Sequence, residues 1–221
     1  ELTLPNDLVR TYSPVNSQSE RHRYVIAVQK DRASRGGSKW VHDNFRPGDV
    51  LAVNSPRNNF MLDETAEKSI FIAGGIGITP ILSMIDRLTT IGRDWELVFC
   101  ARTRSNTPFL ERLQNMPQVR FNFDEEPGGK ILDVAALVRE APPNCHLYCC
   151  GPIPMLDAFE QVTKDTPREQ VHVEYFAAKY PPATEGCFRV VLAKSGKEVM
   201  VPAGKTILET LRESGIDIRF S

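Results

Sequence analysis

The sequence predicts a multi-domain chain whose central part is an α/β fold with a doubly wound, five-stranded parallel sheet. Two observations lead to this prediction. Residues 67–177 alternate short apolar strands with helices, which is the pattern of a parallel sheet covered on both faces. Residues 1–66 and 188–221 instead contain short strands between turn residues, which indicates β-rich regions on either side.

The first region, residues 1–66, is expected to be all β. Strands are predicted at 2–4, 23–30 and 49–56, and the side chains of 23–30 alternate between two faces. So few strands cannot close a barrel by themselves.

Two motifs in this region have the chemistry of an anion site. Arg10 offers a fork of donors that suits a phosphate, and Tyr12 offers a flat ring for stacking on a flat ligand. The sequence Gly36-Gly37-Ser38, preceded by an arginine, is a glycine turn at the start of a short helix. Each motif alone is equally compatible with an ordinary surface turn.

The central region opens with a buried strand at 70–73 that runs through Gly74, Gly75 and Gly77 into an amphipathic helix. Thr79 is expected to cap this helix, whose amino end would present free amides to a phosphate. The glycines would let a ligand approach bare backbone. They do not form the G-x-G-x-x-G fingerprint, so a tight turn without a ligand remains an alternative. The apolar residues of the helix repeat at helical spacing: Ile81, Ile85 and Leu88.

Four further strands are predicted after this helix, at 95–102, 119–124, 145–151 and 170–176, with helices between them. For the strand order 3-2-1-4-5, the order reverses between the first and fourth strands, and ligands bind beyond the carboxyl ends there. Those two ends carry glycine, in Gly74-Gly75 and in Cys150-Gly151-Pro152. The sequence therefore predicts one crevice for a dinucleotide.

The last region follows a linker at 178–187 that is rich in proline. Residues 188–221 contain two predicted strands and a helix that begins at Thr206, has Glu209 three residues later and ends near Gly215. This region is too short to be a stable domain unless more chain follows.

Composition excludes several classes of protein. The formal net charge of -1 gives no reason to expect a nucleic acid or an anionic membrane as a partner, and no apolar run could span a bilayer. The five cysteines fit neither a zinc site nor a disulfide framework, which favours a cytoplasmic location. Cys149 and Cys150 are adjacent, and they are interpreted as small buried residues rather than as a redox pair.

Five ordered motifs resemble one known family over nearly the whole chain. They are RTYS (10–13), RGGS (35–38), AGGIGITPILSM (73–84), YCCGP (148–152) and HVEYF (172–176). The family is that of the phthalate dioxygenase and vanillate demethylase reductases, in the ferredoxin–NADP reductase superfamily. The resemblance implies an antiparallel FMN-binding β-barrel at 1–66, an NADH-binding domain at 67–177, and at 188–221 the first half of a β-grasp, plant-type [2Fe–2S] ferredoxin.

The resemblance also assigns cofactor-binding residues. The flavin and its phosphate would be held by Arg10, Thr11, Tyr12, Ser13, Ala27, Val28, Gln29, Gly36, Gly37, Ser38 and Phe176. The nicotinamide side would be formed by Gly74, Gly75, Gly77, Thr79, Cys150, Gly151 and Pro152. Thr79 and Cys150 are expected to position the reacting rings, and no general base is assigned.

By this resemblance the chain would be the reductase component of a Rieske-type aromatic-ring oxygenase or demethylase system. Electrons would pass from NADH through FMN to a [2Fe–2S] centre and on to the terminal oxygenase. Two departures from the family pattern are visible. The family barrel has strands before the point where this sequence begins, so its N-terminal part is expected to be missing here. None of the five cysteines fits the spacing C-x4-C-x2-C. The cluster is therefore expected in the intact protein, although this chain lacks its ligands.

Two other functions and the choice of coenzyme stay open. The chain could be a stand-alone NAD(P)H-dependent flavin reductase that serves free or haem acceptors, or a nucleotide-binding regulatory module without catalysis. Arg102, in the stretch 101–105 after the second strand, could hold the 2′-phosphate of NADPH, and no carboxylate within that stretch marks a 2′-hydroxyl. The family resemblance favours NADH.

Overall fold

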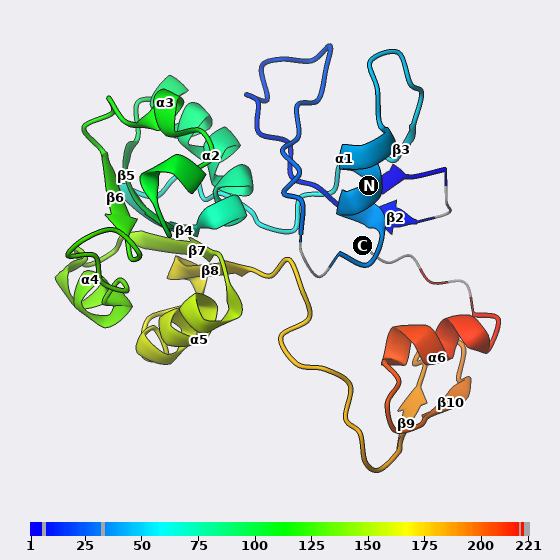
Figure 1. The fold of residues 1–221 in the computed structure, drawn as a ribbon. Coiled ribbons are helices and arrows are strands. Elements are labelled where there is room, and N and C mark those ends of the chain that lie inside the picture. The colour runs from blue at the N-terminus through cyan, green and yellow to red at the C-terminus, as the bar shows by residue number, and fades with distance from the viewer. Residues whose placement is uncertain (6–7, 32–33, 217, 219–221) are drawn as a thin grey trace. The chain divides into compact units, whose positions relative to one another are not determined.

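The computed structural model describes residues 1–5, 8–31, 34–216 and 218, and it divides into two compact units, Glu1–Phe176 and Ala177–Ser221 (Figure 1). The boundary between the units falls beside the start of the linker predicted at 178–187. The predicted division at residue 66 lies inside the first unit and stays a prediction.

A five-stranded parallel sheet forms the centre of the first unit. Its strands are β4 (Lys68–Gly74), β5 (Asp94–Ala101), β6 (Val119–Phe123), β7 (His146–Cys150) and β8 (Val171–Glu174). They lie in the order β6-β5-β4-β7-β8, with all four neighbouring pairs parallel. Numbered along the chain, this is the order 3-2-1-4-5 that the sequence analysis expects.

Helices cover both faces of this sheet (Figure 1). The connections are η1 (Gly75–Gly77), α2 (Ile78–Thr90), η2 (Arg104–Asn106), α3 (Leu110–Leu113), α4 (Val134–Glu140), α5 (Ile153–Val162) and η3 (Arg168–Gln170). Alternate residues of β4 enter two separate cores. Phe71 packs with the buried face of α2, and Ile72 packs with Leu147 and with Phe159 of α5.

The N-terminal part of the first unit is less regular than predicted. It contains β1 (Leu2–Thr3), β2 (Val9–Arg10), α1 (Gly37–Asn44) and β3 (Ala52–Val53), and its sheet has the antiparallel order β2-β1-β3. The described residues form no closed barrel. The strand predicted at 23–30 is wrong, since this segment makes one isolated bridge, between Ile26 and Pro14. Alternating side chains do not make a strand where no neighbouring ladder satisfies the backbone.

This N-terminal part packs directly on the parallel sheet. Val15 and Phe60 are buried in the same core as Phe71 and Tyr148, and the rings of Phe60 and Tyr148 meet edge to face at 5.8 Å. The Tyr148 hydroxyl also accepts the amide of Asp63 at 2.9 Å. One continuous core therefore connects residues before and after position 66.

The second unit contains β9 (Phe188–Val191), β10 (Glu198–Val201) and α6 (Ile207–Glu213), with the two strands paired antiparallel. The predicted start of α6 is confirmed, because Thr206 and Glu209 form a capping box. Two buried apolar side chains, Val201 and Leu211, form the centre of this small unit.

Candidate functional site

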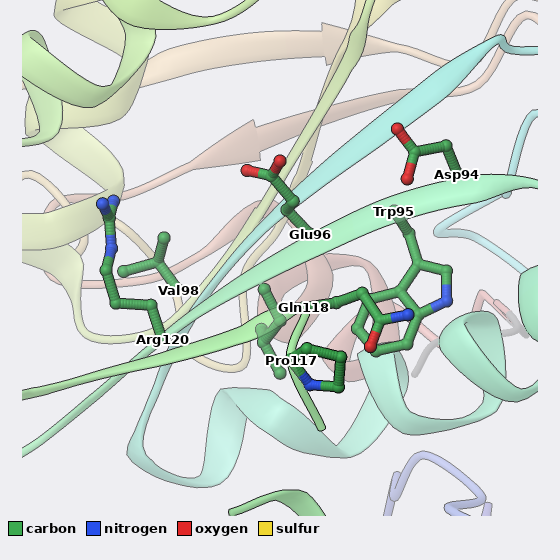
Figure 2. Close-up of a pocket in the computed structure, with 8 residues that line it drawn as sticks. Asp94, Trp95, Glu96, Val98, Pro117, Gln118 and Arg120 are labelled. Atoms are coloured by element: carbon green, nitrogen blue, oxygen red, sulfur yellow. The ribbon is translucent and has the colours of Figure 1, made fainter. Parts of the chain in front are cut away.

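A hollow of about 380 Å³ lies on the sheet, but at the end away from the predicted site (Figure 2). Asp94, Trp95 and Glu96 line it from the first residues of β5, and Pro117 and Gln118 line it from the approach to β6. Ligands of doubly wound sheets bind beyond the opposite, carboxyl ends of the strands. The hollow is therefore not the candidate site.

At the carboxyl edge, the ends of β4 and β7 lie against each other, as predicted for a crevice at the reversal of strand order. A Cβ on Gly77 would lie 2.2 Å from the carbonyl oxygen of Cys150, and one on Gly74 would lie 2.5 Å from Cδ of Pro152. A Cβ on Gly151 would lie 2.8 Å from Sδ of Met155. These three glycines allow two segments of the chain to touch.

At Gly74 and Gly77 the side-chain position is thus filled by other parts of the chain, and the prediction that these two glycines also face a cofactor stays a prediction. Gly75 differs from them. It has φ +53°, and among the described residues, its two chain neighbours aside, no atom lies within 4 Å of where its Cβ would be. Gly75 is the position in this turn where a ligand could approach the backbone.

Thr79 does not cap α2, contrary to the prediction. The 3₁₀ turn η1 moves the helix start upstream, so that Gly77 is the residue before the first helical position. Thr79 is 3% exposed, and its hydroxyl donates to the carbonyl of Ile76 at 3.0 Å. The side chain thus fastens the glycine turn to the first turn of the helix.

Cys149 and Cys150 are buried strand residues, as the sequence analysis expects. They point to opposite faces of the sheet and enter the two different cores. Burial raises the pKa of both thiols far above the ordinary value, with further contributions from Glu174 at Cys150 and from Cys100 at Cys149. Each of the five cysteines is a free thiol.

Glu174 is a residue of this edge that the sequence analysis missed. It stands opposite Cys150 in the pairing of β7 with β8, and burial raises the pKa of its carboxyl. One oxygen, Oε2, is buried without a hydrogen-bond partner among the described residues. The available signal was a charged residue inside a strand that is otherwise apolar or aromatic.

The two anion motifs of the N-terminal part come together, although the sequence separates them by 25 residues. Arg10 lies across Gly37, where a Cβ would be 2.4 Å from the Arg10 Nε. The guanidinium donates to the carbonyls of Val9 and Arg35, both at 2.8 Å. Gly36, with φ +89°, turns the chain into α1. Arginine and helix amino end thus form one basic corner.

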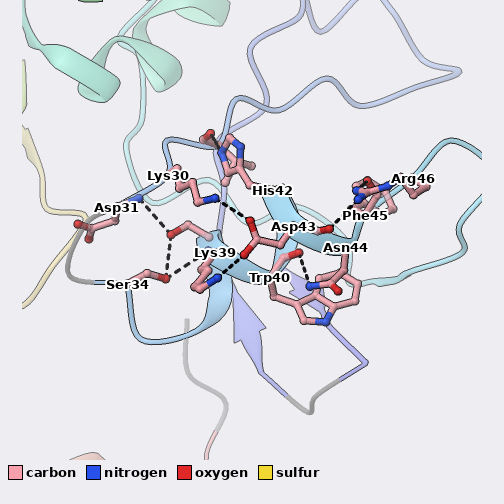
Figure 3. A network of polar contacts seen from close by, with 12 residues as sticks. Lys30, Asp31, Ser34, Lys39, Trp40, His42, Asp43, Asn44, Phe45 and Arg46 are labelled. Carbon is pink, nitrogen blue, oxygen red and sulfur yellow. Dashed lines mark hydrogen bonds and ion pairs between the residues drawn. The ribbon is translucent and has the colours of Figure 1, made fainter.

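Polar contacts hold the remaining part of this corner in place (Figure 3). The Ser38 hydroxyl donates to Ser34 Oγ at 3.0 Å and accepts the amide of Asp31 at 3.3 Å. His42 Nε2 lies 2.7 Å from the carbonyl of Val28. On the outer side of α1, hydrogen bonds from Lys30 and Lys39 lower the pKa of Asp43 to about 2.

The other predicted flavin residues vary in exposure. Thr11, Gln29 and Phe176 are exposed, with Phe176 49% exposed just beyond β8. Tyr12 is half-buried, and burial raises the pKa of its phenol although Arg10 opposes the shift. Ser13 is also half-buried, and Ala27 packs against the core that contains Phe71.

Residues 101–105, at the end of β5 and just beyond it, contain no carboxylate, but the loop after β6 places two carboxylates beside them. Arg102 Nε lies 3.4 Å from Glu125 Oε1, and Glu126 Oε1 accepts the amide of Arg104 at 2.6 Å. The sequence analysis missed both glutamates, because they follow a different strand. No group of three potential metal ligands occurs among the residues that the structure describes.

Comparison with known proteins identifies the family. Residues 71–161 match the model of the oxidoreductase NAD-binding domain. The solved structure of a phthalate dioxygenase reductase, described as modular for electron transfer from pyridine nucleotides to [2Fe–2S], is similar over 99% of this chain and 70% of that chain, with TM-score 0.78 and 36% identity. The chain belongs to the phthalate dioxygenase reductase family.

Two curated relatives extend this family match. A phenoxybenzoate dioxygenase subunit beta from Ectopseudomonas oleovorans is 47% identical over 99% of this chain and 68% of its own length. A tetrachlorobenzoquinone reductase from Sphingobium chlorophenolicum is 45% identical over 100% of this chain and 70% of its own length. The chain is thus an oxidoreductase of the ferredoxin–NADP reductase superfamily. In the described parts of the chain, every helix is too short or too polar to cross a membrane.

Proposed function

We propose that the chain passes electrons from NADH through FMN, and that the protein to which it belongs delivers them by way of a [2Fe–2S] centre to a Rieske-type terminal oxygenase. The observation that supports this most is the meeting of the ends of β4 and β7 beside Gly75, in a chain whose relatives are oxygenase reductases. This places an open backbone position at the reversal of strand order, where dinucleotides bind in such sheets.

The corner of Arg10, Gly37 and Ser38 fits the phosphate of FMN. The carbonyls of Val9 and Arg35 hold the guanidinium, which has five N–H groups and so keeps donors for an anion. Gly37 leaves room for Arg10 across the start of α1, and the helix dipole adds positive potential there. A terminal phosphate site favours FMN, and Tyr12 would contribute the flat ring.

The carboxyl edge fits a nicotinamide. Gly75 would offer open backbone, Thr79 would keep the turn rigid, and Cys150, Gly151 and Pro152 would form the opposite wall. The thiol of Cys150 stays protonated, because burial raises its pKa, so it would contribute packing against the ring and no charge. FMN, when bound, supplies the step between a two-electron donor and a one-electron acceptor. The contribution of the chain is placement of the rings and exclusion of water.

The described residues do not fit a [2Fe–2S] cluster, which needs four ligands in the plant-type pattern. We propose that residues 188–221 are the first half of a ferredoxin domain; β9, β10 and α6 belong to it, and residues 217 and 219–221 lie outside the described residues. A cytoplasmic location also stays a prediction.

A second candidate function is direct reduction of a small quinone. The 45% identity to a protein named tetrachlorobenzoquinone reductase favours it. In this case electrons would leave the flavin for a free acceptor, without a cluster. The two functions share the flavin and nicotinamide sites and differ in the acceptor.

The proposal can be tested by purifying the protein, supplying FMN and measuring NADH oxidation. We expect a yellow protein that oxidises NADH, and an acceptor rate that depends on the cluster-bearing region when an oxygenase is the acceptor. Equal rates with a quinone, with and without that region, would favour the second candidate. A colourless protein that neither takes up FMN nor oxidises NADH would contradict both and indicate a regulatory module.

A further inference from the structure

The loops that follow β5 and β6 form one joined structure at the carboxyl edge. The amide of Asp124 donates to the carbonyl of Ala101 at 3.3 Å, and that of Glu125 donates to the carbonyl of Arg102 at 2.9 Å. The pairing of the two strands therefore continues past their ends. Glu126 adds a third connection, since its carboxylate accepts the amide of Arg104.

The loop after β6, which carries Asp124, Glu125 and Glu126, is also held at its C-terminal end. The amide of Gly129 donates to the carbonyl of Glu126 at 2.7 Å, and Gly128 has φ +80°. A Cβ on Gly129 would lie 2.1 Å from the carbonyl oxygen of Phe123. A tight turn built on two glycines thus holds Glu126 beside the loop after β5.

Both arginines that could attract a phosphate here are already engaged. Arg102 pairs with Glu125, and the Arg104 guanidinium lies over the ring of Phe123, 4.9 Å from its centroid. A ligand phosphate would have to compete with Glu125 and face the carboxylates of Asp124 and Glu126. A ribose hydroxyl would instead find acceptors already in place.

We propose that Glu125 and Glu126 make this chain select NADH over NADPH. In doubly wound sheets the adenosine ribose lies beyond the second strand, which is β5 here, and a carboxylate there binds its 2′-hydroxyl. Glu126 supplies that acceptor, and Glu125 neutralises Arg102 and repels a 2′-phosphate. This inference rests on the proposed function and names the residues that decide its coenzyme.

Calorimetric titration of the whole chain with adenosine 5′-monophosphate and with adenosine 2′,5′-bisphosphate tests the inference without flavin or catalysis. We expect the monophosphate to bind more tightly. Glu125→Gln should raise the affinity for the bisphosphate relative to the monophosphate about tenfold, because a repelling charge is lost. Glu126→Gln should weaken monophosphate binding. Glu140→Gln, at an exposed position at the end of α4, is the control and should leave the ratio unchanged.

Three results would overturn the inference: tighter binding of the bisphosphate by the unchanged chain, an unchanged ratio in both variants, or failure of both nucleotides to bind. The proposed function fails on different results. Loss of NADH oxidation by flavin-loaded protein would contradict the electron route, while the nucleotide ratio would still report on the two glutamates.

Discussion

The two glycine turns of the chain, at the start of α2 and at the start of α1, use glycine in different ways. Gly77 makes room for the backbone carbonyl of Cys150, so the turn before α2 joins two strands of one rigid sheet. Gly37 makes room for the flexible side chain of Arg10, so the turn before α1 holds a charged group. The first turn mainly stabilises the fold, and the second mainly holds Arg10, where we propose an anion site.

Gly77→Ala should break this comparison most strongly. The new methyl group would overlap a backbone carbonyl that cannot move alone, so we expect a loss of about 3 kcal/mol in the free energy of unfolding. Chemical denaturation measures it. Gly75→Ala is the matched control, with about 1 kcal/mol expected from its positive φ alone. Equal losses for both variants would contradict the packing role of Gly77.

Cys150→Ala tests whether the carboxyl edge of the sheet also positions the nicotinamide for reaction. Its side chain packs in the core below the predicted nicotinamide position, so a shift there should slow flavin reduction by NADH about tenfold. Binding of FMN, measured by fluorescence quenching, should change less. The proposed FMN phosphate site is the basic corner of Arg10 and the start of α1, which does not include Cys150. Flavin reduction at the normal rate in stopped flow would refute this role of Cys150.

Gly37→Ala should affect the flavin more than the fold. Arg10 can rotate away from the new methyl group, so we expect at most about 1 kcal/mol of destabilisation. The displaced guanidinium should weaken FMN binding, which a flavin titration measures. Gly48→Ala, in an open turn with φ +95°, should instead cost stability through backbone strain and leave FMN affinity unchanged. A large loss of stability without loss of FMN affinity would reverse the comparison.

The smallest expected effect is a pH dependence of the free energy of unfolding. It arises where Asp63, from the N-terminal part of the first unit, lies near His146 and His172 of the parallel sheet. Burial and the neighbouring His146 lower the pKa of His172, against an opposing effect of Asp63. The His146 Nδ1 and His172 Nε2 atoms are 3.0 Å apart. Because the folded state disfavours protonation of His172, its stability should be complete above about pH 6.5 and fall as the pH drops through the lower, folded pKa.

Urea unfolding at several pH values, compared with His172→Gln, measures this effect. The comparison is needed because the pKa of Glu174 is shifted in the opposite direction, upward, so its stabilising contribution is lost as the pH rises. The substitution should flatten the fall below pH 6.5. An identical pH dependence in both proteins would exclude His172 as its source.

Periodicity was enough to predict the parallel sheet and α2. Ile81, Ile85 and Leu88 repeat at helical spacing, and all three are buried. Periodicity failed at 23–30, because a strand also needs a partner that the pattern cannot reveal. Thr79 was wrongly expected to cap α2, because the 3₁₀ turn Gly75–Gly77 leads directly into the helix, which therefore begins at Ile78.

The sequence predicted which distant residues lie together only where both residues belong to a recognised motif. Gly74 and Gly151 do, and they meet at the reversal of strand order. Glu125 lies outside every motif, and Glu174 lies inside HVEYF without a role assigned to it; the pairing of the strands places the first beside Arg102 and the second opposite Cys150. Such residues need the register of the sheet before they can be found.

Anaerobic stopped-flow mixing of the FMN-loaded chain with NADH tests the central claim most directly. If the carboxyl edge of the sheet presents a nicotinamide to a flavin held at the corner of Arg10 and Gly37, the flavin absorbance should bleach at a rate that saturates with NADH. Bound flavin that stays oxidised at high NADH would contradict the account.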